Sequence, residues 1–201
     1  MLLEQNQVIN FTDLEVKPKP FHYFISPKAF ENEESFLILN WLENDAPWKL
    51  VETDFYEQYE FDFLDVQMPE KLAFLSERNF LDYLTGEYEH LFSAKLESKV
   101  DLTAHKLLPG QTIRLHNDFI SGQETHRLII QFNRGWKDEN GGFLLFFNSS
   151  NPKDIHRVVR PIHNSSVGFA ISPESNHAVS TIYSGERYTL VYSFYATSND
   201  S

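Results

Sequence analysis

The chain has 201 residues, with 29 acidic and 17 basic side chains, and therefore a formal net charge of −12. This balance argues against nucleic acid or an anionic membrane as the main partner, since both need clustered Lys and Arg. The hydrophobic share of 41% excludes a disordered low-complexity chain, and the lack of cysteine excludes disulfides, iron–sulfur clusters and thiolate zinc sites.

The excess negative charge lies in the middle of the sequence. Residues 31–100 hold 17 acids and 5 bases, whereas residues 1–30 and 101–201 are each balanced. The first residues lack the basic and apolar regions of an export signal, and no run reaches the roughly 18 apolar residues of a membrane span. We therefore expect a cytoplasmic protein.

Two helices are predicted in the first hundred residues. The first begins at Ser26-Pro27, which resembles an N-cap followed by proline, and ends before Pro47. Its apolar residues recur at helical spacing: Phe30, Phe36, Leu37, Trp41 and Leu42. The second begins near Asn79 and runs toward Leu96, with one apolar stripe: Phe80, Leu84, Tyr88, Leu91 and Phe92. Residues 48–66, between the helices, are aromatic and acidic, which favours strand and loop.

From residue 100 onward, short runs rich in Val, Ile, Phe and Tyr alternate with Gly, Pro, Asn and Ser. These runs predict strands at residues 112–115, 128–132, 142–147, 167–171 and 188–195. We expect an α+β fold in a single domain, 1–201. Residues 1–100 would form a helical acidic flank with extra strands, and residues 101–201 a β core that carries the site.

One short motif at the end of a predicted strand suggests metal binding. His116 and Asp118 close the run 112–115, and residues i and i+2 of a strand point to the same side. Composition alone produces about one His-x-acid triplet by chance, so the position of the motif carries the information. His177, after a turn-rich segment, is the candidate third ligand. Two histidines and one carboxylate suit non-haem Fe(II).

Arg187 is the candidate for binding an anion. It opens the apolar terminal strand, where a charged side chain is costly unless an anion meets it. Its planar guanidinium can bind a carboxylate through two hydrogen bonds. Thr189 points to the same side and can add a hydroxyl group.

Residues 102–195 resemble the 2-oxoglutarate- and Fe(II)-dependent dioxygenases, in particular their prolyl-hydroxylase-like branch. The resemblance rests on these segments: Leu108-Pro109-Gly110, Arg114-Leu115-His116-Asn117-Asp118, residues 128–136, Gly141-Gly142-Phe143-Leu144, residues 175–179 and Gly185-Glu186-Arg187-Tyr188. It implies a double-stranded β-helix (jelly-roll) core flanked by N-terminal helices.

The resemblance also implies roles for individual residues. His116, Asp118 and His177 would bind iron, and Arg187 would bind the distal carboxylate of 2-oxoglutarate, with Thr189 beside it. Relatives often place tyrosines where this chain has Leu108 and Gln131. Gln131 can donate a hydrogen bond in place of a phenol, whereas Leu108 cannot.

The expected activity is hydroxylation of a prolyl residue or a proline-like substrate, with release of succinate and CO2. The expected cofactors are Fe(II), 2-oxoglutarate and O2, with ascorbate as a stimulant. The substrate would be an amino acid, a peptide or a protein, and the acidic flank suggests a basic one. Residues 119–125 are a candidate lid because they carry Gly122 and polar neighbours. The oligomeric state stays open.

Three alternatives remain. The first is an oxygenase of the same superfamily that acts on another amino acid, a peptide or a small natural product. The second acts on nucleobases, but the repair members of that kind carry a second Arg where this chain has Ser193. The third is a jelly-roll binding module without catalysis. Outside the motifs, we expect Arg127 to face solvent and Trp136 to serve in packing.

Overall fold

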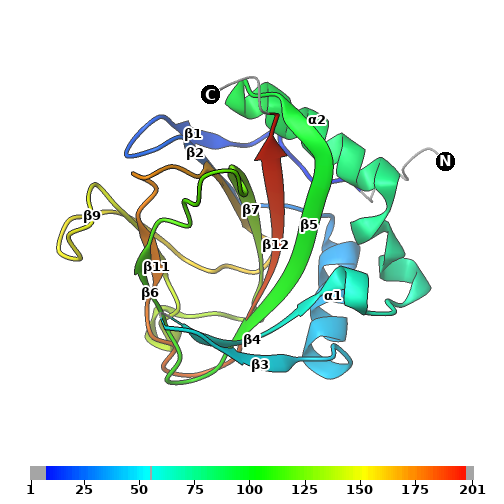
Figure 1. Cartoon of the computed structure of the whole chain (residues 1–201). Coiled ribbons are helices and arrows are strands. Elements are labelled where there is room, and N and C mark those ends of the chain that lie inside the picture. Colours follow the sequence, from blue (N-terminus) through cyan, green and yellow to red (C-terminus); the bar gives the residue numbers. More distant parts are fainter. Residues whose placement is uncertain (1–7, 55, 198–201) are drawn as a thin grey trace.

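The computed structural model describes residues 8–54 and 56–197, which form two facing antiparallel sheets (Figure 1). The large sheet has the strand order β1-β2-β10-β7-β12-β5-β4-β3, and the small sheet has the order β6-β11-β8-β9. The large-sheet strands are β1 (Glu15–Lys17), β2 (Tyr23–Ser26), β3 (Lys49–Glu52), β4 (Glu57–Asp62), β5 (Leu96–Leu107), β7 (His126–Phe132), β10 (Ser166–Ala170) and β12 (Arg187–Ala196). The small-sheet strands are β6 (Ile113–His116), β8 (Leu144–Phe147), β9 (Ile155–Val159) and β11 (His177–Val179).

The helices lie on the side of the large sheet that faces away from β6 and β11 (Figure 1). They are α1 (Asn32–Asn44) and α2 (Arg78–Phe92), with short 3-10 turns at Phe63–Asp65, Glu70–Ser76 and Asp138–Asn140. The predicted α+β class is confirmed.

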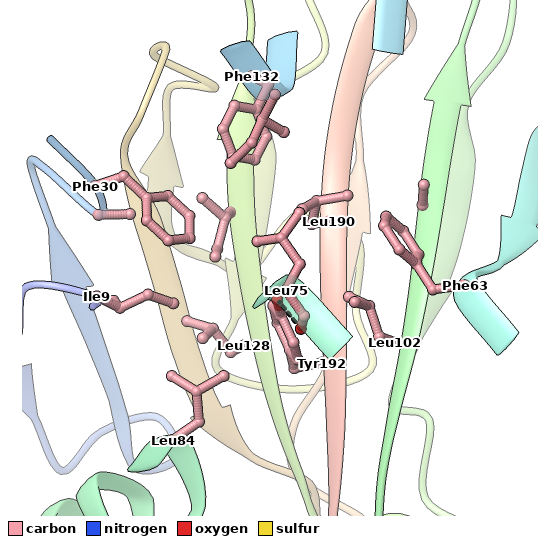
Figure 2. Close-up of a cluster of buried hydrophobic side chains, with 14 of the residues drawn as sticks. Ile9, Phe30, Phe63, Leu75, Leu84, Leu102, Leu128, Phe132, Leu190 and Tyr192 are labelled. Carbon is pink, nitrogen blue, oxygen red and sulfur yellow. Dashed lines mark hydrogen bonds between the residues drawn. The ribbon is translucent and has the colours of Figure 1, made fainter. Parts of the chain in front are cut away.

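The main apolar core fills the space between the helices and the outer face of the large sheet. Figure 2 shows part of it, in which Leu102, Leu128, Leu190 and Tyr192 of the sheet lie beside Leu84 of α2 and residues from the connecting segments. A second apolar cluster lies between the two sheets, with Leu107, Ile129, Phe146 and Val167 among its members. Both faces of the large sheet are therefore packed at its centre, which makes its inner face a rigid support for polar groups.

The first helix starts later than the sequence predicts. Ser26 is the last residue of β2 and pairs with Ser166 of β10, so α1 begins only at Asn32. Its end before Pro47 is confirmed, because the helix ends at Asn44. Phe36 is 48% exposed and therefore does not belong to the buried stripe.

The second helix carries the expected buried residues but ends earlier. Phe80, Leu84 and Tyr88 of α2 are fully buried. Ser93 adopts a left-handed conformation with φ of 53° and caps the helix, so Leu96 begins β5 instead of ending α2. A left-handed residue at this place is a common way to end a helix.

The two parts of the chain share one sheet. Strand β5 runs across residue 100, and β1 to β4 from the first part pair within the large sheet. We propose that the acidic first part and the β core form one domain. Neither described helix is long and apolar enough to cross a membrane.

Candidate active site

His116, Asp118 and His177 meet between the sheets at the ends of two paired strands. His116 ends β6, His177 begins β11, and the two residues are direct partners in the antiparallel register. Asp118 follows in a left-handed conformation with φ of 58°, which turns the chain at this point. Their ligand atoms lie within 4.8 Å of one another, so the three side chains can hold one metal ion.

Both imidazole rings are oriented by backbone carbonyls. His116 Nδ1 lies 2.7 Å from the Arg114 oxygen, and His177 Nδ1 lies 2.7 Å from the Ser175 oxygen. Because a carbonyl can only accept, each Nδ1 carries the proton and each Nε2 faces Asp118, at 3.2 Å from His116 and 3.0 Å from His177. Metal-binding histidines are commonly held in this way.

The electrostatics of the group favour metal binding. Burial raises the pKa of Asp118, but Arg127 and the neighbouring side chains of His116 and His177 outweigh this and hold that pKa below its usual range. Burial lowers the pKa of His177. An ionised carboxylate and a neutral imidazole are the forms that bind metal ions.

Arg187 lies in the same cavity, and no described carboxylate pairs with it. A cavity of about 440 Å³ is lined by the three side chains above and by Arg187, which begins β12 and is only 3% exposed. Among the described residues Arg187 forms no ion pair with a carboxylate, and its Nε has no hydrogen-bond partner. Burial lowers its pKa to about 10, so the guanidinium remains charged at neutral pH. The cavity therefore offers a site for an anion.

Thr189 and Gln131 are neighbours across the large sheet. Thr189 of β12 pairs with Gln131 of β7, and both are buried. Thr189 lines the cavity, whereas the described lining does not include Gln131. Gln131 Nε2 is buried without a hydrogen-bond partner and is free to donate one.

The prediction that Arg127 faces solvent is wrong, because Arg127 lies in the cavity. It forms ion pairs with Asp118 and Glu124, and its side chain is 17% exposed. It pairs with Ser193 of β12 on the inner face of the large sheet. The alternation along β7 offered a signal, because Arg127 and Ile129 line the cavity from one face of that strand.

His105 is a second residue of the cavity that the sequence did not single out. It lies opposite Thr189 and lines the cavity. Burial lowers its pKa to about 3, with smaller effects of Arg127 and Arg187 in the same direction, so the imidazole is neutral.

The packing around Gly142 explains why the segment Gly141-Gly142-Phe143-Leu144 contains a glycine at this position. With φ of 68°, a Cβ there would lie 2.6 Å from Ile182 Cδ1, 3.1 Å from Arg187 Cδ and 3.2 Å from Trp136 Cζ2. The glycine therefore allows the Arg187 stem and Trp136 to approach the backbone closely. Trp136 also donates a hydrogen bond to the Gly141 oxygen, in agreement with a packing role.

Residues 102–194 match the family model of the 2OG-Fe(II) oxygenase superfamily. Three solved structures share the fold. A prolyl-4-hydroxylase of Pseudomonas putida is 20% identical, with a TM-score of 0.65 over 81% of this chain and 85% of that one. A prolyl 4-hydroxylase of Phytophthora capsici is 19% identical, with a TM-score of 0.66 over 89% and 60%. A prolyl hydroxylase of Trichoplax adhaerens, in complex with a hypoxia inducible factor peptide, is 14% identical, with a TM-score of 0.65 over 81% and 77%.

The donor set of the cavity fits the groups that this family uses. Two imidazoles and a carboxylate within 4.8 Å suit Fe(II), and the buried, unpaired Arg187 suits the dianionic 2-oxoglutarate. The predicted jelly-roll core is confirmed by the two facing sheets and by the shared fold. Residues 102–194, which carry all four of these side chains, are similar to the 2OG-Fe(II) oxygenase superfamily, and their donor set supports the use of Fe(II), 2-oxoglutarate and O2.

Proposed function

We propose that this protein hydroxylates a prolyl residue or a proline-like substrate and releases succinate and CO2. One observation carries the proposal: a three-ligand group and an unpaired buried arginine line a single cavity of about 440 Å³. The prolyl preference is supported by the fold shared with several prolyl hydroxylases.

In this proposal the side chains bind and orient the reactants. His116, Asp118 and His177 hold Fe(II), and Arg187 binds the distal carboxylate of 2-oxoglutarate. Iron with 2-oxoglutarate supplies the oxidative chemistry, which couples decarboxylation to hydroxylation. The protein contributes the geometry that positions the reactants.

Thr189 and Gln131 are proposed to complete the binding of 2-oxoglutarate. The Thr189 hydroxyl lies two residues from Arg187 on the same strand and lines the cavity. Gln131 Nε2 is a buried donor that has no partner among the described residues. A carboxylate beside Thr189 would accept from its hydroxyl group, and Gln131 is the neighbouring donor whose unsatisfied amide costs about 1–3 kcal/mol.

The substrate is proposed to be a peptide or a protein segment. One of the similar structures holds a peptide fragment, and the cavity is open to solvent beside Ile120, which is 65% exposed. The nucleobase alternative is disfavoured because Ser193, where a second Arg would be needed, lines the cavity.

Two measurements test the proposal. Anaerobic titration of Fe(II) and 2-oxoglutarate should produce a visible metal-to-ligand absorption band, and succinate release should rise with proline-containing peptides. His177→Ala should lose both signals. His156→Ala removes an exposed histidine outside the cavity lining and serves as the matched control, which should retain both.

The outcomes separate the alternatives. Absence of the band would refute the oxygenase reading and leave a binding module. A band with succinate release on other amino acids, but none on proline-containing compounds, would replace the prolyl assignment and keep the oxygenase.

A further inference from the structure

One wall of the cavity carries acidic side chains. Strand β4 presents Gln58, Glu60 and Asp62 to the cavity, and we call these three residues the β4 wall. The alternate residue Phe61 belongs to the core under the helices, as the two faces of a strand require. The wall is joined to the sheet through β5, where Glu60 pairs with His105 and Asp62 with Thr103.

The other charged groups of the cavity are compensated. Arg127 is paired with Asp118 and Glu124, and Asp101 is paired with Lys99 at 3.2 Å. In the proposed loaded site, the two charges of Fe(II), Asp118, Arg187 and dianionic 2-oxoglutarate sum to zero. Arg127 and Glu124 likewise cancel.

Glu60 and Asp62 lack such compensation. Neither forms an ion pair with any described residue. The nearest titratable neighbour across the sheet, His105, is neutral because burial lowers its pKa to about 3. The loaded cavity would therefore keep two negative charges, both on the β4 wall.

Gln58 provides an independent indication of a ligand. It is 2% exposed, its Nε2 donates to Glu60 Oε2 at 2.8 Å, and its buried Oε1 has no hydrogen-bond partner in the part of the chain that the structure describes. The orientation of the amide is determined, because a carboxylate can only accept and must face the NH2 group. The remaining oxygen is a buried acceptor that needs a donor, and Gln58 is one of the residues that line the cavity.

We propose that the β4 wall binds a cationic nitrogen group of the substrate. An ammonium group supplies both a positive charge and several N–H donors, which match Glu60 and Gln58 Oε1, while Asp62 adds charge. The inference rests on the proposed function only in that the substrate enters this cavity. The group comes either from a lysine side chain next to the reacting residue or from the amine of a free amino acid.

Calorimetric titration of the Fe(II)- and 2-oxoglutarate-loaded protein under anaerobic conditions tests this. The probes are acetyl-Lys-Pro-amide, the same peptide acetylated on the lysine nitrogen, acetyl-Lys-Ala-amide and free L-proline. The variants are Glu60→Gln and Asp62→Asn, with Glu52→Gln as the matched control, because Glu52 is exposed on the adjacent β3 and does not line this cavity.

We expect acetyl-Lys-Pro-amide to bind at least roughly tenfold more tightly than its acetylated form, since hydrogen bonds to charged groups are worth that much or more. Glu60→Gln should remove most of this preference, Asp62→Asn part of it, and Glu52→Gln none. Glu60-dependent binding of free L-proline, without a preference between the peptides, would identify the free amine as the source.

Equal binding of acetyl-Lys-Pro-amide and its lysine-acetylated form would overturn the inference if Glu60→Gln also leaves the binding of L-proline unchanged. Absence of binding by every cationic probe would overturn it as well. Acetyl-Lys-Ala-amide separates this inference from the proposed function. If its binding depends on Glu60 but no proline-containing probe releases succinate, the cation subsite stands and the prolyl assignment fails. In a separate aerobic assay, equal succinate release from acetyl-Lys-Pro-amide and its lysine-acetylated form, with equal affinity for both and with L-proline binding that does not depend on Glu60, keeps the prolyl assignment and refutes the subsite.

Discussion

Replacement of Arg187 by Met should separate binding from stability. Burial lowers the pKa of Arg187 from its usual value to about 10, which corresponds to about 3 kcal/mol against the charged form in the folded protein. Arg187 is protonated in the folded and unfolded chains below pH 10, so this cost is fully present at pH 7 and is relieved only as the pH rises through 10 toward the usual pKa of arginine. Methionine retains an unbranched stem without the charge.

The variant should therefore be more stable without ligand and should lose its response to 2-oxoglutarate. The gain in unfolding free energy is as much as about 3 kcal/mol, or about 6–12 °C in Tm for a domain of this size. Loss of a charge-assisted bidentate contact of about 3 kcal/mol would raise the Kd of 2-oxoglutarate about 150-fold.

Thermal unfolding with anaerobic Fe(II), with and without 2-oxoglutarate, measures both effects. At 100 times the wild-type Kd, 2-oxoglutarate should stabilise the wild type by about 2.7 kcal/mol and Arg187→Met by about 0.3 kcal/mol. Wild-type affinity in the variant would refute the role of Arg187. A ligand-free variant that is less stable than the wild type would refute the reasoning on its burial.

Three further predictions follow from other parts of the structure. His177→Ala should weaken Fe(II) binding at least about 100-fold, because losing a residue that only hydrogen-bonds to a metal ligand already costs up to about that much. An unchanged calorimetric Kd for Fe(II) would contradict the ligand assignment. Burial, with a smaller effect of His22, lowers the pKa of His126 to about 4. Because the unfolded histidine takes up a proton first as the pH falls, the unfolding free energy of the wild type should fall by about 2 kcal/mol more than that of His126→Gln between pH 8 and pH 5. Denaturant titrations at the two pH values measure this difference. Gly168→Ala should cost about 1–3 kcal/mol of stability because its Cβ would lie 2.2 Å from the Phe24 ring. Gly86→Ala in α2 should stabilise the fold by about 0.5–1 kcal/mol, because a Cβ there meets nothing within 4 Å. Equal effects of the two substitutions would refute the packing argument.

Local patterns predicted the elements whose residues interact mainly with near neighbours. The stripe of Phe80, Leu84 and Tyr88 belongs to α2 and is buried, because residues four apart share a helix face. The start of α1 was mispredicted for the opposite reason. Ser26 carries a helix-start signal, but its pairing with Ser166, 140 positions away, holds it in a strand.

Long-range pairing also decided the surroundings of the site. Arg127 is adjacent to a buried histidine in sequence, and only the pairing of β7 with β12 shows that it faces the cavity and contacts Asp118. The same holds for the β4 wall. Alternation in residues 57–62 indicates two faces, but it does not say which face meets the helices and which meets the metal ligands.

The residue types and their spacing along the chain already indicate the chemistry of the site: His116 and Asp118 on one side of a strand, a later histidine, and an arginine in an apolar strand. Those features depend on backbone geometry over a few residues. Only the folded arrangement shows that His177 pairs with His116, that Arg187 has no carboxylate partner among the described residues, and that the cavity has an acidic wall. These facts depend on register between distant strands, which no local pattern encodes. The net charge of −12 therefore lies partly at the site, because two of the acidic residues, Glu60 and Asp62, line the cavity.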